Sequence, residues 1–164
     1  MLIGLVLAGC AARPALRTVP SVDPARYAGT WHEIARYPNW FQRGCERNTT
    51  AEYTLEPGGS LRVTNRCTGK NGKPMSVTGT ATVVPGSGNA KLKVGFGGPF
   101  RGDYWIIGLD EKNYSWAVVG HPSRQFLWIL AREPRLPMET YDRLVALAVA
   151  QGYDARRIVR DPRP

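Results

Sequence analysis

The sequence predicts an all-β fold, an eight-stranded antiparallel up-and-down β-barrel with one C-terminal α-helix packed outside it. Short segments rich in β-branched and aromatic residues follow one another and are separated by turn signals. The chain contains 18 Gly and 13 Pro in 164 residues, as expected for many strands joined by turns. Its length suits one domain with a single hydrophobic core.

Two hairpins are the clearest local features. The turn sequence PGG at 57–59 separates two strand-like segments, and PGSGN at 85–89 separates two more. The predicted strands are 31–36, 49–55, 61–67, 76–84, 90–96, 104–109, 114–120 and 126–132. Eight antiparallel strands close into a barrel whose interior can hold one small ligand.

One helix is predicted near the end of the chain. Pro137 suits its first position, and Gly152 is placed to terminate it. Its apolar face consists of residues at three- and four-residue spacing, namely Tyr141, Leu144, Val145 and Ala148. A short strand at 158–159 is expected to close the domain.

The formal net charge of +9 does not by itself indicate a nucleic-acid partner. Lys and Arg are scattered along the chain, and no block of them resembles a basic arm or a recognition helix. We therefore expect no nucleic acid to bind. Attraction to an anionic membrane accounts for the charge equally well, at about 1 kcal/mol for each basic residue near the surface. So does a solvated basic surface without a partner.

The first residues indicate export. The run MLIGLVLAG at 1–9 is uncharged, apolar and too short for a bilayer, which requires about 20 apolar residues. It is similar to the end of a signal peptide's apolar region, and the missing basic residues before it predict a start further upstream. The sequence LAGC at 7–10 resembles the lipobox of bacterial lipoproteins, in which the cysteine is acylated. The alternative is an apolar leader followed by a chance cysteine.

This resemblance divides the chain into a signal peptide at 1–9, a lipidated tether at 10–22 and a barrel domain at 23–164. Acylation of Cys10 with two or three chains would anchor the protein firmly. In lipoproteins of enteric bacteria an Asp after the cysteine resembles an inner-membrane retention signal, and here the residue is Ala11. The expected location is the outer membrane of a bacterial cell envelope.

Three motifs resemble the signatures of the lipocalin family. YAGTW at 27–31, followed by EIAR at 33–36, is similar to the G-x-W motif that opens the barrel. GDY at 102–104 and LWILAR at 127–132 resemble the second and third signatures. The resemblance covers about residues 24–160 and is nearest to the branch of bacterial lipocalins and apolipoprotein D. His32, where Tyr is usual, and Gly102, where Thr is usual, depart from that branch.

The resemblance implies a structural role for the signature residues Gly29, Trp31, Asp103, Tyr104 and Arg132. It places Arg132 beside Trp31 at the closed end of the barrel, where a guanidinium over an indole contributes about 1–2 kcal/mol if desolvated. Arg suits such stacking better than Lys does.

Ligand contacts are expected from side chains inside the barrel. If Arg132 points inward, strand alternation turns Leu130, Trp128 and Phe126 to the same side. The resemblance adds Tyr53 and Trp105 to the cavity, and it places Trp40 and Phe41 at the open mouth. Large apolar side chains of this kind suit a hydrophobic ligand. The alternative is that they fill a solid core.

The cysteines and histidines favour a binding protein over an enzyme. Cys45 and Cys67 lie on either side of the first hairpin, remote from its turn, so a disulfide is predicted. A thiol nucleophile is the alternative, but Cys45 has no His near it in the sequence. The only histidines, His32 and His121, are too far apart to indicate a metal site. No cofactor or metal is expected, and no Ser-His-Asp arrangement is evident.

The leading hypothesis is a membrane-anchored protein that binds fatty acids, lysophospholipids or similar apolar molecules for lipid transport, lipid storage or envelope maintenance. The ligand class is what the resemblance implies. One alternative is a lipocalin-fold enzyme that acts on an enclosed lipid, which would require a polar pair inside the barrel that the sequence does not reveal. Another is a structural lipoprotein with a filled barrel. A homodimer remains open.

Overall fold

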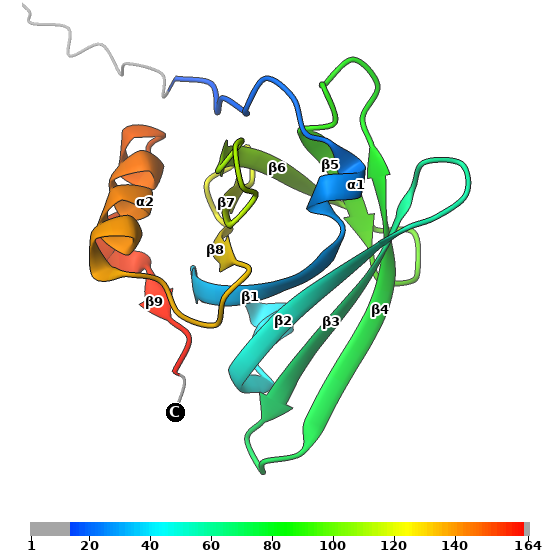
Figure 1. Cartoon of the computed structure of the whole chain (residues 1–164). Helices are drawn as coiled ribbons and strands as arrows, with labels where there is room; N and C mark the ends of the chain where they lie inside the picture. Colours follow the sequence, from blue (N-terminus) through cyan, green and yellow to red (C-terminus); the bar gives the residue numbers. More distant parts are fainter. Residues whose placement is uncertain (1–13, 163–164) are drawn as a thin grey trace, which may run out of the picture.

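The computed structural model describes residues 14–162, and its strands form a closed antiparallel barrel (Figure 1). Each strand pairs with the next along the chain from β2 to β8, and β1 pairs with both β8 and β2 to close the ring. The strands are β1 Gly29–Arg36, β2 Cys45–Leu55, β3 Leu61–Gly69, β4 Pro74–Val83, β5 Lys91–Gly95, β6 Gly102–Leu109, β7 Trp116–Gly120, β8 Leu127–Ala131 and β9 Val159–Arg160.

Strand β1 closes the barrel because its two halves have different neighbours. Its first half pairs with β2, with Gly29 opposite Tyr53. Its second half pairs with β8, with Arg36 opposite Trp128. The edge that β2 leaves free near Arg36 is taken by β9, outside the ring. No long strand edge is therefore left open at the junction.

Helix α2 covers one side of the barrel (Figure 1). It spans Met138–Ala150, so Pro137 occupies the position before the first helical residue rather than the first helical position. Gly152, with a φ of +92°, follows its end in the left-handed conformation that glycine tolerates. Three short helical turns complete the described elements, namely α1 Pro24–Tyr27, η1 Trp40–Gln42 and η2 Ala155–Arg157.

Alternating side chains along the strands form two hydrophobic clusters. The inner cluster lies on the inner face of the barrel and includes Trp31, Tyr53, Leu92, Ile106 and Leu130. The outer cluster lies between α2 and the barrel wall and includes Ile107, Val118, Ile129, Leu144 and Ala148. The predicted apolar face of the helix thus packs on the outside of strands β6–β8.

Several strand boundaries differ from the predicted ones. Strand β2 begins at Cys45 instead of residue 49, because two bulges and a positive φ at Asn48 carry the pairing through a polar segment that is typical of a loop. Strand β7 begins at Trp116, because Tyr114 has a φ of +53° and belongs to the preceding turn.

Residues 14–22, the described part of the predicted tether, pack against the barrel. Leu16 is buried in the outer cluster, and Val22 is buried in the inner one. Their backbone is also held, since the Val19 N–H donates to the Ile106 carbonyl and the Val22 N–H to that of Gly88. Apolar side chains at these positions explain the packing. The remaining part of the predicted tether, the signal peptide and Cys10 lie outside the described residues.

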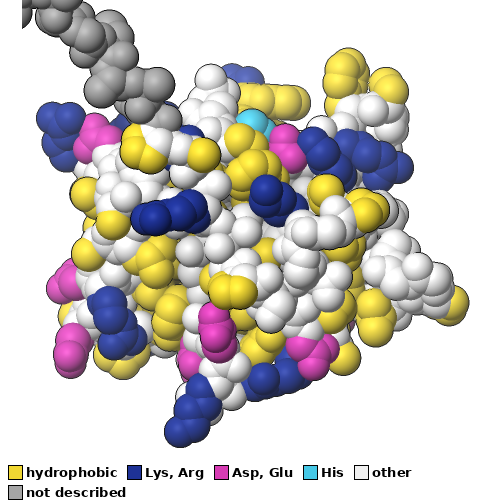
Figure 2. Space-filling view, turned by 90° about the horizontal axis from the view of Figure 1, so that it is seen from above, with side chains coloured by type: hydrophobic (Ala, Val, Ile, Leu, Met, Phe, Trp, Pro, Cys, Tyr) yellow, Lys and Arg dark blue, Asp and Glu magenta, His cyan; other side chains and the backbone are white. Residues whose placement is uncertain are grey.

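The two ends of the barrel differ. The closed end carries α1 and the loops at 56–60, 84–90 and 110–115, whereas the open end carries the loops at 37–44, 70–73, 96–101 and 121–126. On the face seen in Figure 2, basic side chains are spread among hydrophobic and acidic ones and form no single patch. Within residues 14–162, no helix has the length and apolar character needed to cross a membrane.

Candidate functional site

The closed end is sealed around Trp31 and Arg132. The Arg132 guanidinium carbon lies 3.8 Å from the centre of the Trp31 ring. Its Nη atoms donate to the carbonyls of Thr30 and Ala28, both at 2.9 Å. The Trp31 indole N–H donates to the Tyr27 carbonyl. The predicted contact is present, and it ties β8, β1 and α1 together.

Gly29 of the first signature is explained by the same contact. Its φ is +96°, a conformation that glycine adopts at little cost. A Cβ at this position would lie only 3.2 Å from Nη1 of Arg132. A larger residue would therefore strain the backbone and crowd the guanidinium.

Exposure on the inner face of the barrel rises towards the open end. Near the closed end, Trp31, Ile106 and Leu92 are fully buried. Near the open end, Val94 and Trp128 belong to the same inner cluster but are only partly buried. On β4, Val77 and Met75 share the inward side of Ala81, and each is almost half exposed. The barrel interior is therefore accessible from one end.

Four aromatic side chains gather at the open end. The rings of Phe126 and Trp128 stack with centroids 6.1 Å apart, and Phe41 lies 5.5 Å from Phe126. Trp40 meets Phe41 edge-to-face. Strand β8 and the turn η1, far apart in the sequence, thus build one aromatic wall. All four were predicted as ligand residues.

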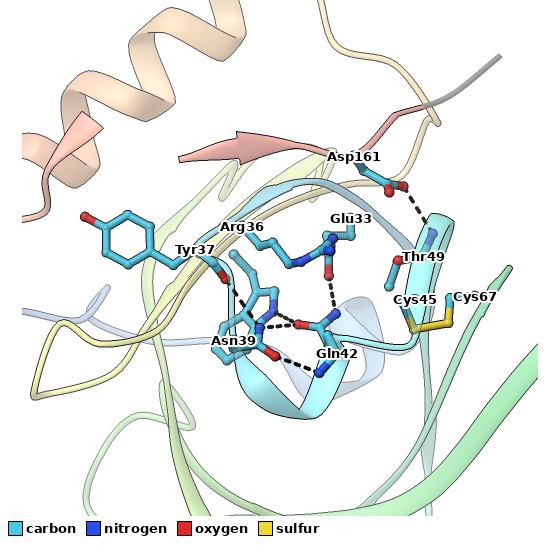
Figure 3. A network of polar contacts seen from close by, with 10 residues as sticks. Glu33, Arg36, Tyr37, Asn39, Gln42, Cys45, Thr49, Cys67 and Asp161 are labelled. Atoms are coloured by element: carbon cyan, nitrogen blue, oxygen red, sulfur yellow. Dashed lines mark hydrogen bonds and ion pairs between the residues drawn. A yellow bond between two sulfur atoms is a disulfide. The ribbon is translucent and has the colours of Figure 1, made fainter. Parts of the chain in front are cut away.

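A polar network lies inside this wall, on β1 and η1 (Figure 3). Glu33 is buried and forms an ion pair with Arg36. Gln42 donates from Nε2 to Glu33 Oε2 at 2.8 Å, and its Oε1 accepts the Trp128 indole N–H at 3.0 Å. Burial raises the pKa of Glu33, and the charge of Arg36 and the hydrogen bond from Gln42 offset only part of that rise.

A strand bulge brings Glu33 and Arg36 to the same side of β1. Residues three apart face opposite sides of a regular strand. Here Ile34 and Ala35 both pack in the outer cluster, and the pairing of β1 with β8 shifts between Glu33 and Ala35. The bulge is therefore what places a charged pair inside the barrel, a pair that sequence analysis did not find.

The turn η1 is fixed to the mouth at both ends. Asn39 accepts the Gln42 N–H and donates to its side-chain oxygen at 2.6 Å (Figure 3). Shortly after the turn, Cys45 forms a disulfide with Cys67, with Cα atoms 5.5 Å apart. The predicted disulfide is confirmed, and it holds the start of β2 to β3.

Three tyrosines form a second polar group deeper in the barrel. The Tyr53 hydroxyl donates to that of Tyr104 at 2.9 Å, and Tyr27 and Tyr104 are in contact at 2.8 Å. Burial raises the pKa of Tyr53 to about 12 and that of the other two hydroxyls as well. Three protonated hydroxyls share two contacts, so one O–H proton is not used within the group.

The remaining predicted ligand residues do not all lie inside the barrel. Tyr53 and Leu130 are buried in the inner cluster. The placement of Trp105 in the cavity is wrong. Tyr104 and Ile106 face inward, so Trp105 faces out, with the Lys91 ammonium 4.1 Å from its ring centre. Its neighbour Asp103, of the second signature, is also on the outside and pairs with Lys93 at 2.7 Å.

A Ser-His-Asp set occurs on the outer rim but lacks the geometry of a catalytic triad. His121 Nδ1 is 2.8 Å from Ser123 Oγ, while its Nε2 is 4.0 Å from Asp103. In a triad, the carboxylate hydrogen-bonds the imidazole. The Ser123 N–H also donates to Nδ1, which is a local turn arrangement. Among residues 14–162, no cluster of three or more potential metal-ligating His, Cys, Asp or Glu side chains is present.

Comparison with known proteins agrees with a closed antiparallel barrel. The profile of the lipocalin-like domain matches residues 22–163. The chain belongs to the lipocalin family. Insecticyanin from the tobacco hornworm, a solved structure, superposes with a TM-score of 0.73 at 22% identity, covering 93% of this chain and 87% of that one.

Relatives come from bacteria, plants and animals. Outer membrane lipoprotein Blc of Vibrio cholerae is 34% identical over 161 residues, which are 97% of this chain and 94% of the relative. Temperature-induced lipocalin-1 of Arabidopsis thaliana is 40% identical over 155 residues, 90% and 82% of the two chains. Apolipoprotein D of Macaca fascicularis is 30% identical over 142 residues, 83% and 74%. The resemblance to this branch is confirmed.

Proposed function

We propose that this lipocalin binds a fatty acid or a lysophospholipid, with the acyl chain inside the barrel and the anionic head near the mouth. The main support is that side chains on the inner face of the barrel become more exposed towards the open end. Apolar residues of one continuous lining change from fully buried at Trp31 to partly exposed at Trp128. An apolar channel open at one end suits a single acyl chain.

The polar network supports an amphiphilic ligand with a negative head. Arg36 lies beside the aromatic wall, and its side chain is 16% exposed. A guanidinium retains donors after pairing with one carboxylate, because it carries five N–H groups. A ligand carboxylate or phosphate at the mouth would be favoured there, and a guanidinium suits either. Free fatty acids and lysophospholipids share this chemistry.

We further propose that the protein is anchored in a bacterial outer membrane through acylated Cys10. Support comes from the LAGC sequence at 7–10 and from the similarity to lipoproteins of that membrane. A lipid-anchored binding protein would hold acyl ligands close to the bilayer from which they come. Transport, storage and envelope maintenance all fit this placement.

The test is to identify and then exchange the ligand. Native mass spectrometry of the purified protein is expected to show co-purified acyl lipid. Delipidated protein should bind an added fatty acid and a lysophospholipid saturably, and the corresponding fatty alcohol more weakly because it lacks the anionic head. Failure to bind any single-chain amphiphile would contradict the proposal and favour a structural lipoprotein.

A further inference from the structure

Exposed aromatic side chains are concentrated at the open end. Within residues 14–162, the Trp and Phe side chains that are more than 40% exposed are Trp40, Phe41, Phe96 and Phe100. All four belong to open-end loops. Phe100 is 86% exposed and Trp40 69%. Apolar rings held in water at the tips of neighbouring loops mark a surface that is covered in function.

The same loops carry only positive formal charge. The loops at 37–44, 70–73, 96–101 and 121–126 contain no Asp or Glu, and their basic residues are Arg43, Lys70, Lys73, Arg101 and Arg124. The closed-end loops at 56–60 and 110–115, by contrast, contain three acidic residues, Glu56, Asp110 and Glu111, and one basic residue, Lys112. The barrel is therefore electrically polar, with its positive end at the mouth.

The described chain also begins at the open end. Arg124, in the loop at 121–126, donates to the carbonyl of Pro14. From there the chain passes the C-terminal end of α2, where Arg17 and Gln151 exchange hydrogen bonds, and reaches the closed end at Val22. Cys10 precedes Pro14 by four residues, which span at most about 14 Å.

That reach decides which end can meet a membrane that holds Cys10. An eight-residue strand such as β1 covers about 20 Å along the barrel axis at the usual tilt. A link of about 14 Å from the open end is too short for the barrel to stand upright on its closed end at that surface. It is long enough for the open-end loops to touch it.

We propose that the open end docks on an anionic phospholipid bilayer, with Trp40, Phe41, Phe96 and Phe100 in the interfacial layer and the basic residues against lipid phosphates. Aromatic and basic side chains together are what such an interface favours. The mouth then opens onto the lipid, so a ligand passes between membrane and barrel without crossing water.

A second copy of the chain is a poorer occupant of this face. A two-fold dimer through the open end would place the same basic residues of each copy opposite one another. Like charges brought together in this way disfavour association. An anionic surface complements the charge and the aromatic side chains alike.

The test uses the full chain with Cys10→Ala, so that docking is measured without the anchor. We expect it to co-sediment with vesicles of phosphatidylethanolamine and phosphatidylglycerol, far less with phosphatidylcholine vesicles, and less at high salt. In this background, Phe100→Ser with Arg101→Ser should reduce vesicle binding roughly tenfold or more. The matched closed-end variant, Leu55→Ser with Lys112→Ser, should bind within about twofold of the parent.

Ligand binding separates this proposal from the proposed function. Phe100 and Arg101 lie outside the proposed ligand site, so the open-end variant should still bind fatty acid in solution. Equal loss of vesicle binding in the open-end and closed-end variants would overturn the docking proposal. The docking proposal would also be overturned if the Cys10→Ala protein did not bind anionic vesicles. It would be overturned as well if that protein formed a dimer in solution that Phe100→Ser dissociates.

Trp40 offers a direct readout of depth. Vesicles whose acyl chains carry bromine quench indole emission only on contact with the bilayer. Part of the emission of the Cys10→Ala protein should be quenched, and Trp40→Phe should remove that part. Quenching that is unchanged in Trp40→Phe would place the membrane contact elsewhere on the protein.

Discussion

The Arg132 guanidinium lies over the Trp31 indole, with 3.8 Å between its central carbon and the ring centre. Two interactions therefore act on one side chain, a cation–π contact and hydrogen bonds to carbonyls of the α1–β1 segment. Arg132 belongs to the end of the sheet remote from the mouth. The pair should thus govern stability and leave ligand affinity unchanged.

Arg132→Ala is expected to lower the free energy of unfolding by roughly 1–4 kcal/mol, combining lost stacking with unpaired carbonyls. Arg143→Ala, on the exposed side of α2, is the control and should change stability by less than about 0.5 kcal/mol. Urea unfolding of both variants measures the difference. An Arg132→Ala protein with full stability but no ligand binding would show that the closed and open ends are assigned the wrong way round.

Trp128→Glu should abolish most binding of a long-chain fatty acid, since it puts a carboxylate into the proposed apolar ligand site, opposite Arg36, where it would compete with the ligand's anionic head. Trp128→Phe keeps most of the apolar surface and should weaken binding only mildly. Trp105→Gln is the matched control, because Trp105 lies on the outer wall and should not affect affinity. Saturable quenching of tryptophan emission provides the assay. Normal fatty-acid binding by a folded Trp128→Glu protein would contradict a ligand site inside the barrel.

Glu33 should make stability fall as the pH rises through the acidic range. Burial raises its pKa in the folded protein above the ordinary value of about 4.3. Between the two values, the folded state binds more protons than the unfolded state, so the stabilisation is present below the lower value and lost above the higher one. Unfolding of the parent and Glu33→Gln from pH 4 to 7 tests this sign. The parent should lose stability relative to the variant over that range, and a relative gain would contradict it.

Removal of the disulfide with Cys45→Ala and Cys67→Ala should lower the free energy of unfolding by about 3 kcal/mol, as expected for a loop of this length. Reduction of the parent with dithiothreitol should cause a similar loss, whereas the double variant should not respond. Thermal unfolding with and without reductant makes the comparison. A parent that unfolds identically in both conditions would exclude a stabilising bridge.

Cys10→Ala, expressed behind a complete signal peptide, should move the protein from the membrane fraction to the soluble fraction at high salt. High salt is needed because it weakens the electrostatic docking proposed for the open end. Ser21→Ala, on an exposed residue that follows the acylation sequence, should leave the protein in the membrane fraction. Equal membrane recovery of the parent and Cys10→Ala would show that no lipid is attached at this position.

Local pattern was sufficient for most of the architecture. Turn-forming glycines and prolines, period-two strands and one helical period predicted the barrel and α2, because each is a property of neighbouring residues. The three signatures predicted the contact of Trp31 with Arg132. Side-chain alternation along β1 also predicts that Glu33, two residues after the inward-facing Trp31, points into the barrel.

Other features depended on contacts between distant segments. The bulge after Glu33 turns Arg36 inward, and the pairing of β1 with β8 creates that bulge. Gln42 hydrogen-bonds both Glu33 and Trp128, and it can do so only because η1 folds over the mouth. The packing of residues 14–22, which places Pro14 near the open end, depends on α2 and β6. The sequence alone determined the strands and their order, because these follow from local periodicity. Only the tertiary structure decided which side chains share the interior and at which end residue 14 lies, because bulges, register and packing are set across the barrel.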